Sequence, residues 1–238
     1  MKKVLPTLRY LLKSYSKVIV IGFLSMLVTI AITDVIFYLT DRWNTDHQIV
    51  SLTVPFELTT GIFAVMIGLL LFILNFKMML ANGVSRKSYL IANLPAALAA
   101  AAVFSLFNLA SAEIHSQFWK INFIANLVYP INWFGLLVFQ FALYLFLIAL
   151  GWAIALAYYR SSVPVKWIFT MSPFVLLYLL FADQSRTLYY AIEEPLKILM
   201  GLREDPHNHF QAAGSMLAGF ALLSGIVYLL LRRAPLKN

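Results

Sequence analysis

Long runs of apolar residues dominate the chain, and they set the predicted fold. Six runs stand out, at 18–40, 56–76, 89–111, 132–158, 167–182 and 210–231. A helix rises about 1.5 Å per residue, so all runs but the fifth can cross a hydrocarbon core of about 30 Å. Hydrocarbon offers no hydrogen-bond partners to the backbone, and a helix satisfies its backbone groups internally. The pattern therefore predicts an all-α polytopic membrane protein with six transmembrane helices.

The segment before the first run has a different pattern. Residues 1–17 carry apolar side chains at helical spacing among basic ones: Leu5, Leu8, Leu12 and Tyr15. This arrangement is typical of an amphipathic helix that lies at the membrane surface. We therefore predict an N-terminal interfacial helix on the inner leaflet, ahead of the first span. Because no small-residue cleavage site follows the first run, we expect it to be a retained helix and not a signal peptide.

A partly apolar stretch, residues 183–209, separates the short fifth run from the sixth. Its apolar stripe lies opposite Glu193, Glu194 and Lys197 and consists of Leu188, Ile192, Leu196 and Leu199. One interpretation is a re-entrant outer segment between helices 5 and 6, broken near Pro195. A surface helix on the outer face explains the stripe equally well.

Composition supports a membrane location and a single domain. The chain has 238 residues, of which 62% are hydrophobic and 12% charged, whereas a soluble domain is nearer half apolar and a quarter charged. We expect one transmembrane domain over 1–238, with the interfacial helix at 1–17, the bundle at 18–231 and a tail at 232–238. Cysteine is absent from the sequence, which excludes disulfides, thiolate metal sites and cysteine nucleophiles.

The distribution of charge predicts the orientation. With the N-terminus inside, the cytoplasmic segments hold thirteen of the 18 basic residues and none of the ten acidic ones. Lys and Arg stay on the cytoplasmic side during insertion. We therefore expect a protein of the bacterial cytoplasmic membrane with both termini on the cytoplasmic side. The basic excess faces anionic lipid and cytoplasmic partners, so a nucleic-acid role is not expected.

The turn between the second and third runs is the most informative local motif. Residues 77–81 can form a helical turn, Asn82 and Gly83 tolerate a left-handed stop, and Ser85 can cap the next helix. We call residues 77–87 the basic turn. It is either a compact projection that contacts a partner or an ordinary helix–turn–helix connection whose charges follow the positive-inside rule.

A resemblance favours the first interpretation. The matching positions are Phe76, Leu80, Asn82, Gly83, Ser85, Arg86, Lys87 and Tyr89. Together with the layout of almost the whole chain, they resemble the permease subunits of type-2 ABC exporters, above all those of Gram-positive bacteria. In that family this turn is a coupling helix that docks in a groove of the ATPase subunit. The resemblance implies docking by Lys77, Met78, Met79, Leu80 and Ala81, at an angle fixed by Asn82, Gly83, Ser85 and Arg86.

The resemblance also implies the partners and the activity. The sequence contains no Gly-Lys pair and hence no phosphate-binding loop, so this chain is not expected to be an enzyme or to bind a cofactor itself. ATP and Mg would bind to a separate ABC ATPase subunit, and a second permease, identical or related, would complete the pathway. The implied cargo is an amphipathic peptide or lipid-like molecule. A non-transporting protein on the same fold, such as an immunity factor, scaffold or sensor subunit, remains the alternative.

Few residues suggest chemistry inside the membrane. Asp34 lies within the first predicted span, where it would act as a proton relay or cationic-substrate contact, or be satisfied locally by Thr33 and Tyr38. Residues 204–209 contain two histidines but no fixed set of ligands, so we expect a solvated loop and no metal site. Ser105, Asn108 and Gln140 are expected to form hydrogen bonds between helices. An intramembrane protease is disfavoured because no protease motif occurs.

Overall fold

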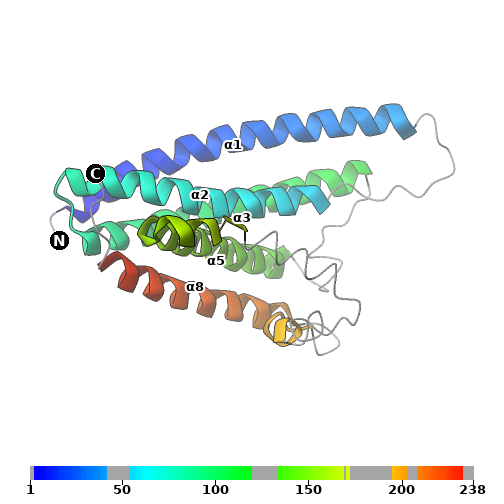
Figure 1. Cartoon of the computed structure of the whole chain (residues 1–238). Helices are drawn as coiled ribbons and strands as arrows, with labels where there is room; N and C mark the ends of the chain where they lie inside the picture. Colours follow the sequence, from blue (N-terminus) through cyan, green and yellow to red (C-terminus); the bar gives the residue numbers. More distant parts are fainter. Residues whose placement is uncertain are drawn as a thin grey trace.

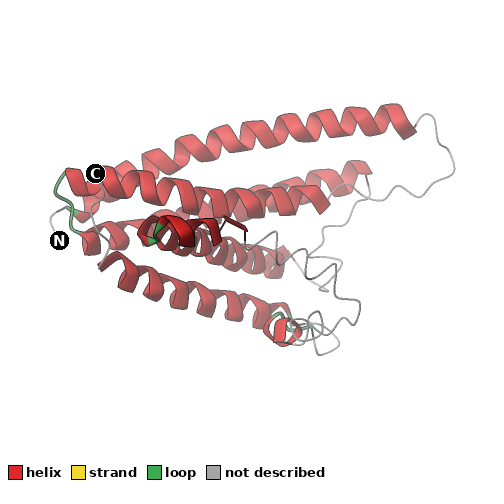
Figure 2. Cartoon of the chain, viewed as in Figure 1, coloured by secondary structure: helices red, strands yellow, loops and turns green. Residues whose placement is uncertain are grey.

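The computed structural model of the chain describes residues 3–41, 54–119, 133–168, 170–171, 195–202 and 208–232. This part of the chain contains helices and turns and no strand (Figure 2). Its five long helices are labelled in Figure 1: α1 (Val4–Asp41), α2 (Val54–Ala81), α3 (Arg86–Trp119), α5 (Trp133–Arg160) and α8 (His209–Arg232). The all-α prediction is confirmed for these residues.

Four stretches are long and apolar enough to cross a membrane: Thr59–Ala81, Arg86–Ser111, Trp133–Arg160 and His209–Arg232. They correspond to the second, third, fourth and sixth predicted spans, and they support a helical, membrane-embedded protein. The first predicted span lies in α1 and is not among the four. Most of the fifth, 167–182, lies outside the described residues. The count of six therefore stays a prediction.

Helix α5 is the centre of the bundle. It packs along α2 on one side and α8 on the other and also contacts α3, while α1 lies mainly against α3 (Figure 1). At the crossing of α2 and α5, a Cβ atom on Gly68 would overlap the Ile148 carbonyl oxygen, and one on Gly151 would overlap the Val65 carbonyl oxygen. Glycine is required at both positions because the two backbones approach so closely.

The boundary expected after residue 17 is absent, because α1 is one continuous helix of 38 residues. No glycine or proline interrupts the sequence between Pro6 and Gly22, so nothing locally favours a break. The buried face of this part consists of Leu11, Tyr15 and Ile19 and runs on toward the core, while Leu5 and Leu12 are exposed. At about 1.5 Å per residue, α1 is longer than a hydrocarbon core of about 30 Å.

Part of the outer segment is described. Residues 195–199 are helical and lie against the first turns of α8 (orange in Figure 1). The residues just before Pro195 lie outside the described ones, so the break there stays a prediction. Gln211 Nε2 donates to the Ile198 carbonyl oxygen at 2.9 Å, and Ser215 Oγ donates to the Leu199 carbonyl oxygen at 2.7 Å. Residues 183–194 and 203–207 lie outside the described residues, so the re-entrant path stays a prediction.

Candidate functional site

The basic turn begins with a tightly closed end of α2. Val84 N donates to the Met79 carbonyl oxygen at 3.0 Å, and Gly83 N donates to the Leu80 carbonyl oxygen at 2.9 Å. These two bonds form a Schellman motif, in which the residue after the helix adopts a left-handed conformation. Gly83 has φ 71°, a value that glycine adopts without the steric cost that a Cβ atom brings. The predicted left-handed stop is confirmed.

The other side of the turn is closed by a helix cap. Ser88 N donates to Ser85 Oγ at 3.1 Å, and Tyr89 N donates to the Ser85 carbonyl oxygen at 2.9 Å. Ser85 is therefore the N-cap of α3, as the sequence predicted. Residues 82–85 alone join α2 to α3 (Figure 2). Both helix ends satisfy their backbone groups within the turn, so it has little freedom to bend.

The surface of the basic turn is mostly polar and basic, and Met78 is its one large exposed apolar side chain. Lys77, Met78, Ala81, Asn82, Gly83, Ser85 and Lys87 are exposed. Met79, which the resemblance placed among the docking residues, is only 6% exposed and packs in the core, and Leu80 is half-buried. The docking turn expected at Lys77–Ala81 is the last turn of α2 and no separate helix.

Helix α1 supports the turn through side chains that the sequence analysis did not single out. Lys3 Nζ donates to the carbonyl oxygens of Asn82 and Gly83, at 3.3 and 3.0 Å. Tyr10 Oη donates to the Met78 sulfur at 3.5 Å. Asn75 Nδ2 donates to Ser14 Oγ at 3.4 Å. Residues 3, 10 and 14 share a helix face, and this spacing was the only signal in the sequence.

Arg86 connects the turn to the last helix. Its Nη1 donates to the Arg232 carbonyl oxygen at 2.8 Å, at the end of α8. Arg160, the last residue of α5, donates from Nη1 to the Leu230 carbonyl oxygen at 3.3 Å. The start of α3 and the ends of α5 and α8 therefore meet at one end of the bundle. Nothing in the sequence pattern pairs residues so far apart.

A buried layer of aromatic and polar groups lies directly beneath the turn. Tyr89 Oη donates to the Phe72 carbonyl oxygen at 2.6 Å, and Tyr15 Oη donates to Asn93 Oδ1 at 3.2 Å. The ring of Phe76 packs between Tyr89 and Tyr159, with centroids 5.6 and 6.2 Å apart. These contacts link α1, α2, α3 and α5, so a force on the turn reaches four helices through packed side chains.

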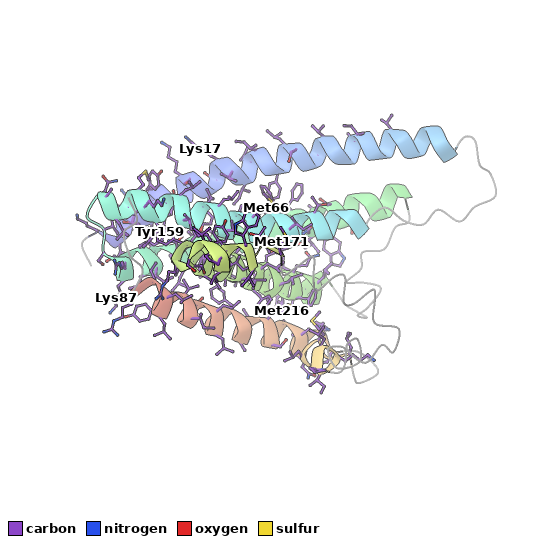
Figure 3. All side chains as sticks on the ribbon, in the orientation of Figure 1. Lys17, Met66, Lys87, Tyr159, Met171 and Met216 are labelled. Carbon is purple, nitrogen blue, oxygen red and sulfur yellow. The ribbon has the colours of Figure 1, made fainter. Side chains whose placement is uncertain are left out.

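The charge of this end is one-sided. The basic side chains described here are Lys3, Arg9, Lys13, Lys17, Lys77, Arg86, Lys87, Arg160, Lys166 and Arg232. Lys77 Nζ lies 5.6 Å from the centre of the Tyr159 ring, within the range of a cation–π contact. Lys87 lies at the tip of the bundle and Lys17 points away from α1 (Figure 3). The described acidic residues, Asp34, Asp41, Glu57 and Glu113, lie toward the other ends of their helices.

Only some of the other candidate residues named from the sequence lie in the part of the chain that the structure describes. Asn108 bonds to Thr60 and to Tyr144, joining α2, α3 and α5 as predicted. Ser105 instead donates to the Ala102 carbonyl oxygen within α3, so the predicted inter-helix bond is wrong for this residue. The side chain of Asp34 and residues 203–207 of the two-histidine loop lie outside the described residues. Within the described residues, no three His, Cys, Asp or Glu side chains gather as a metal site would require.

Comparison of the chain with protein-family models, with curated proteins and with solved structures gave no match.

Proposed function

We propose that the chain is the membrane-spanning permease subunit of an ABC exporter, driven by ATP hydrolysis on a separate ATPase subunit. The observation that supports this best is the basic turn itself. It joins α2 to α3 above a buried layer that links four helices, is closed at both sides by its own hydrogen bonds, and exposes Lys77, Met78, Asn82 and Lys87. An ordinary connection between two helices needs neither the Lys3 contacts nor the buried layer beneath.

The geometry gives the turn a mechanical role. The Schellman motif at Gly83 and the Ser85 cap fix the turn to α2 and α3, so a push on it displaces both helices together and does not bend the connection. Lys3 carries the displacement to α1, and Arg86 carries it to the end of α8. ATP-driven closure of the partner would thereby rearrange a pair of such bundles and move an amphipathic peptide or lipid-like cargo across the membrane.

The exposed side chains of the turn also predict what the complementary partner surface contains. Lys77 and Lys87 are exposed, and the described residues at this end include no carboxylate. Met78 is 37% exposed and offers a flexible apolar side chain that adapts to a shallow pocket. The partner groove is therefore expected to carry acidic side chains around a small apolar floor, because complementary charge directs the encounter and the apolar contact holds it.

Site-specific cross-linking tests this proposal. Because the chain has no cysteine, an Ala81→Cys variant can carry a single photo-activated cross-linker on the exposed edge of the turn. After expression and irradiation in the native membrane, the expected product is an adduct with a protein that has a phosphate-binding loop and hydrolyses ATP. Phe210→Cys, exposed at the opposite end of α8, is the matched control and should give no such adduct.

Charge reversal tests the same contact by function. Lys77→Glu combined with Lys87→Glu should abolish co-purification of the ATPase, while Lys13→Glu combined with Lys17→Glu, with the same change of charge on exposed positions of α1, should retain it. An equal loss of co-purified ATPase in both variants would show that the turn contributes no more than the rest of the basic surface. An adduct at residue 81 that lacks ATPase activity would favour the non-transporting alternative.

A further inference from the structure

The meeting point of α3, α5 and α8 holds more positive charge than the described residues neutralise. We call Arg86, Arg160 and Arg232 the arginine corner. The first two direct their guanidinium groups at the last turn of α8, where they bond to the carbonyl oxygens of Arg232 and Leu230. The Arg232 side chain itself is exposed. All three charges therefore belong to adjoining helix ends.

The helix end compensates only a fraction of this charge. A helix C-terminus is equivalent to roughly half a negative charge, against three guanidinium groups. Within the described residues, no carboxylate forms an ion pair with any of them. Each guanidinium has five N–H donors, and the structure gives Arg86 and Arg160 one bond each. Both side chains are half-buried, where water screens charge less than in bulk solvent. Donors and charge remain for an anion.

The surface beside the corner indicates which anion. After Arg160 the chain turns at Ser161 and Ser162 into a short helix, and Lys166 Nζ lies 5.1 Å from the centre of the Tyr158 ring, which holds that helix next to α5. Its most exposed apolar side chains are Val163, Trp167 and Ile168, which are 67%, 63% and 67% exposed. Trp and Tyr at a helix end beside Arg and Lys are the combination that membrane interfaces favour.

We propose that the arginine corner and residues 163–168 together bind one anionic phospholipid. The headgroup phosphate accepts hydrogen bonds from Arg86 and Arg160, whose planar guanidinium groups suit phosphate oxygens. The glycerol backbone and upper acyl chain lie on Trp167 and Ile168. A free phosphate ion or an acidic protein surface would use the charges but leave these apolar side chains exposed to water. This site needs the helices to lie in a membrane and does not depend on the proposed transport function.

Lipid-dependent stability tests the site with defined probes. The purified full-length chain is placed in nanodiscs of phosphatidylcholine with or without phosphatidylglycerol, and its thermal midpoint is compared. Phosphatidylglycerol should raise the midpoint of the wild type, and native mass spectrometry should show one tightly retained phosphatidylglycerol. Arg86→Gln combined with Arg160→Gln should lose this increment and bind the lipid at least tenfold more weakly. The increment compares two lipids within one variant, so a general loss of stability does not mimic it.

Matched variants decide between the possible outcomes. Lys13→Gln combined with Lys17→Gln removes the same charge from exposed positions of α1 and should keep the increment. If it loses as much as the arginine variant, the effect is diffuse and the site is wrong. If the double arginine variant does not fold, Arg232→Gln replaces it, because that exposed side chain has no partner among the described residues.

An arm with inorganic phosphate separates lipid from free anion. Inorganic phosphate should not raise the midpoint of the detergent-solubilised protein, whereas solubilised phosphatidylglycerol should. Trp167→Ala should weaken lipid binding without changing any response to phosphate. An equal response of the wild type to phosphate and to lipid, or retention of the lipid by both arginine variants, would overturn the proposal.

Discussion

The α2–α5 crossing and the basic end hold helices together by opposite means. At the crossing, Gly68 and Gly151 let two backbones touch, so any added side-chain atom overlaps a carbonyl oxygen. At the basic end, Lys3, Arg86 and Arg160 reach across with long side chains to backbone carbonyls. The first arrangement depends on the absence of side chains and the second on flexible ones.

This difference indicates which region moves. Closely packed backbones tolerate little displacement, because interiors are as dense as organic crystals. A hydrogen bond from an exposed side chain such as Lys3 contributes little to stability, about 0–1 kcal/mol. The long side chains of the half-buried Arg86 and Arg160 can reach new acceptors. We therefore infer that the crossing acts as the fixed pivot and that the basic end is the part displaced by a partner. Substitutions should be severe at the first region and mild at the second.

The largest effect is expected at the pivot. Gly151→Ala places a methyl group against the Val65 carbonyl, and forced overpacking of this kind costs up to about 3 kcal/mol. The free energy of unfolding in mixed detergent should fall by that amount. Gly225→Ala is the control, because nothing lies within 4 Å of the added atom, and alanine favours a helix by up to about 1 kcal/mol. Equal stability of the two variants would show that the crossing is not close-packed.

A smaller loss is expected in the buried polar group that ties α3 to α5. Tyr144→Phe removes the hydroxyl that accepts a hydrogen bond from Asn108 Nδ2. A buried donor that loses its partner costs about 1–3 kcal/mol. The thermal midpoint should fall, and Tyr144→Phe combined with Asn108→Leu should recover part of the loss. A double variant that is less stable than the single one would mean that Asn108 does not depend on this bond.

A moderate loss is expected at the left-handed residue of the basic turn. Gly83→Ala forces a Cβ atom into positive φ, at a cost of roughly 1–2 kcal/mol. Gly83→Asn should cost less, because asparagine tolerates this conformation. Both can be measured as unfolding free energies beside Gly151→Ala. If Ala and Asn are equally tolerated at residue 83, the turn is not held in the conformation described.

The smallest effect on stability, and the most informative one, is expected at Lys3. Lys3→Met removes both bonds to the turn and should change the unfolding free energy by about 1 kcal/mol or less. A nitroxide at Ala81→Cys should nevertheless become more mobile by electron paramagnetic resonance, and Lys3→Arg should restore the ordered spectrum. If the nitroxide in the Lys3→Met variant is no more mobile than in the wild type, the Lys3 bonds do not order the turn.

Local signals predicted the turn well. Gly83 forms the predicted left-handed stop and Ser85 the predicted N-cap. Each acts on its nearest backbone groups, so the residue type alone indicates the conformation. The helices α2, α3, α5 and α8 were predictable for a similar reason, since each contains a stretch long and apolar enough to cross a membrane.

Long-range contacts were not predictable from the pattern. Gly214 and Gly225 lie within apolar runs just as Gly68 and Gly151 do, yet the first two face open space and the last two face a backbone. A glycine within an apolar run does not indicate which helix it meets. The contacts of Arg86 and Lys3 are likewise set by how helices assemble.

If the proposed function is right, ATP turnover on a partner moves the basic turn. The most direct test is electron paramagnetic resonance of a nitroxide at Ala81→Cys, in the complex purified from the native membrane, before and after trapping with ATP and vanadate. The account predicts a nucleotide-dependent change of the spectrum at residue 81 and none at Phe210→Cys. A spectrum at residue 81 that does not respond to nucleotide in a complex that hydrolyses ATP would contradict it.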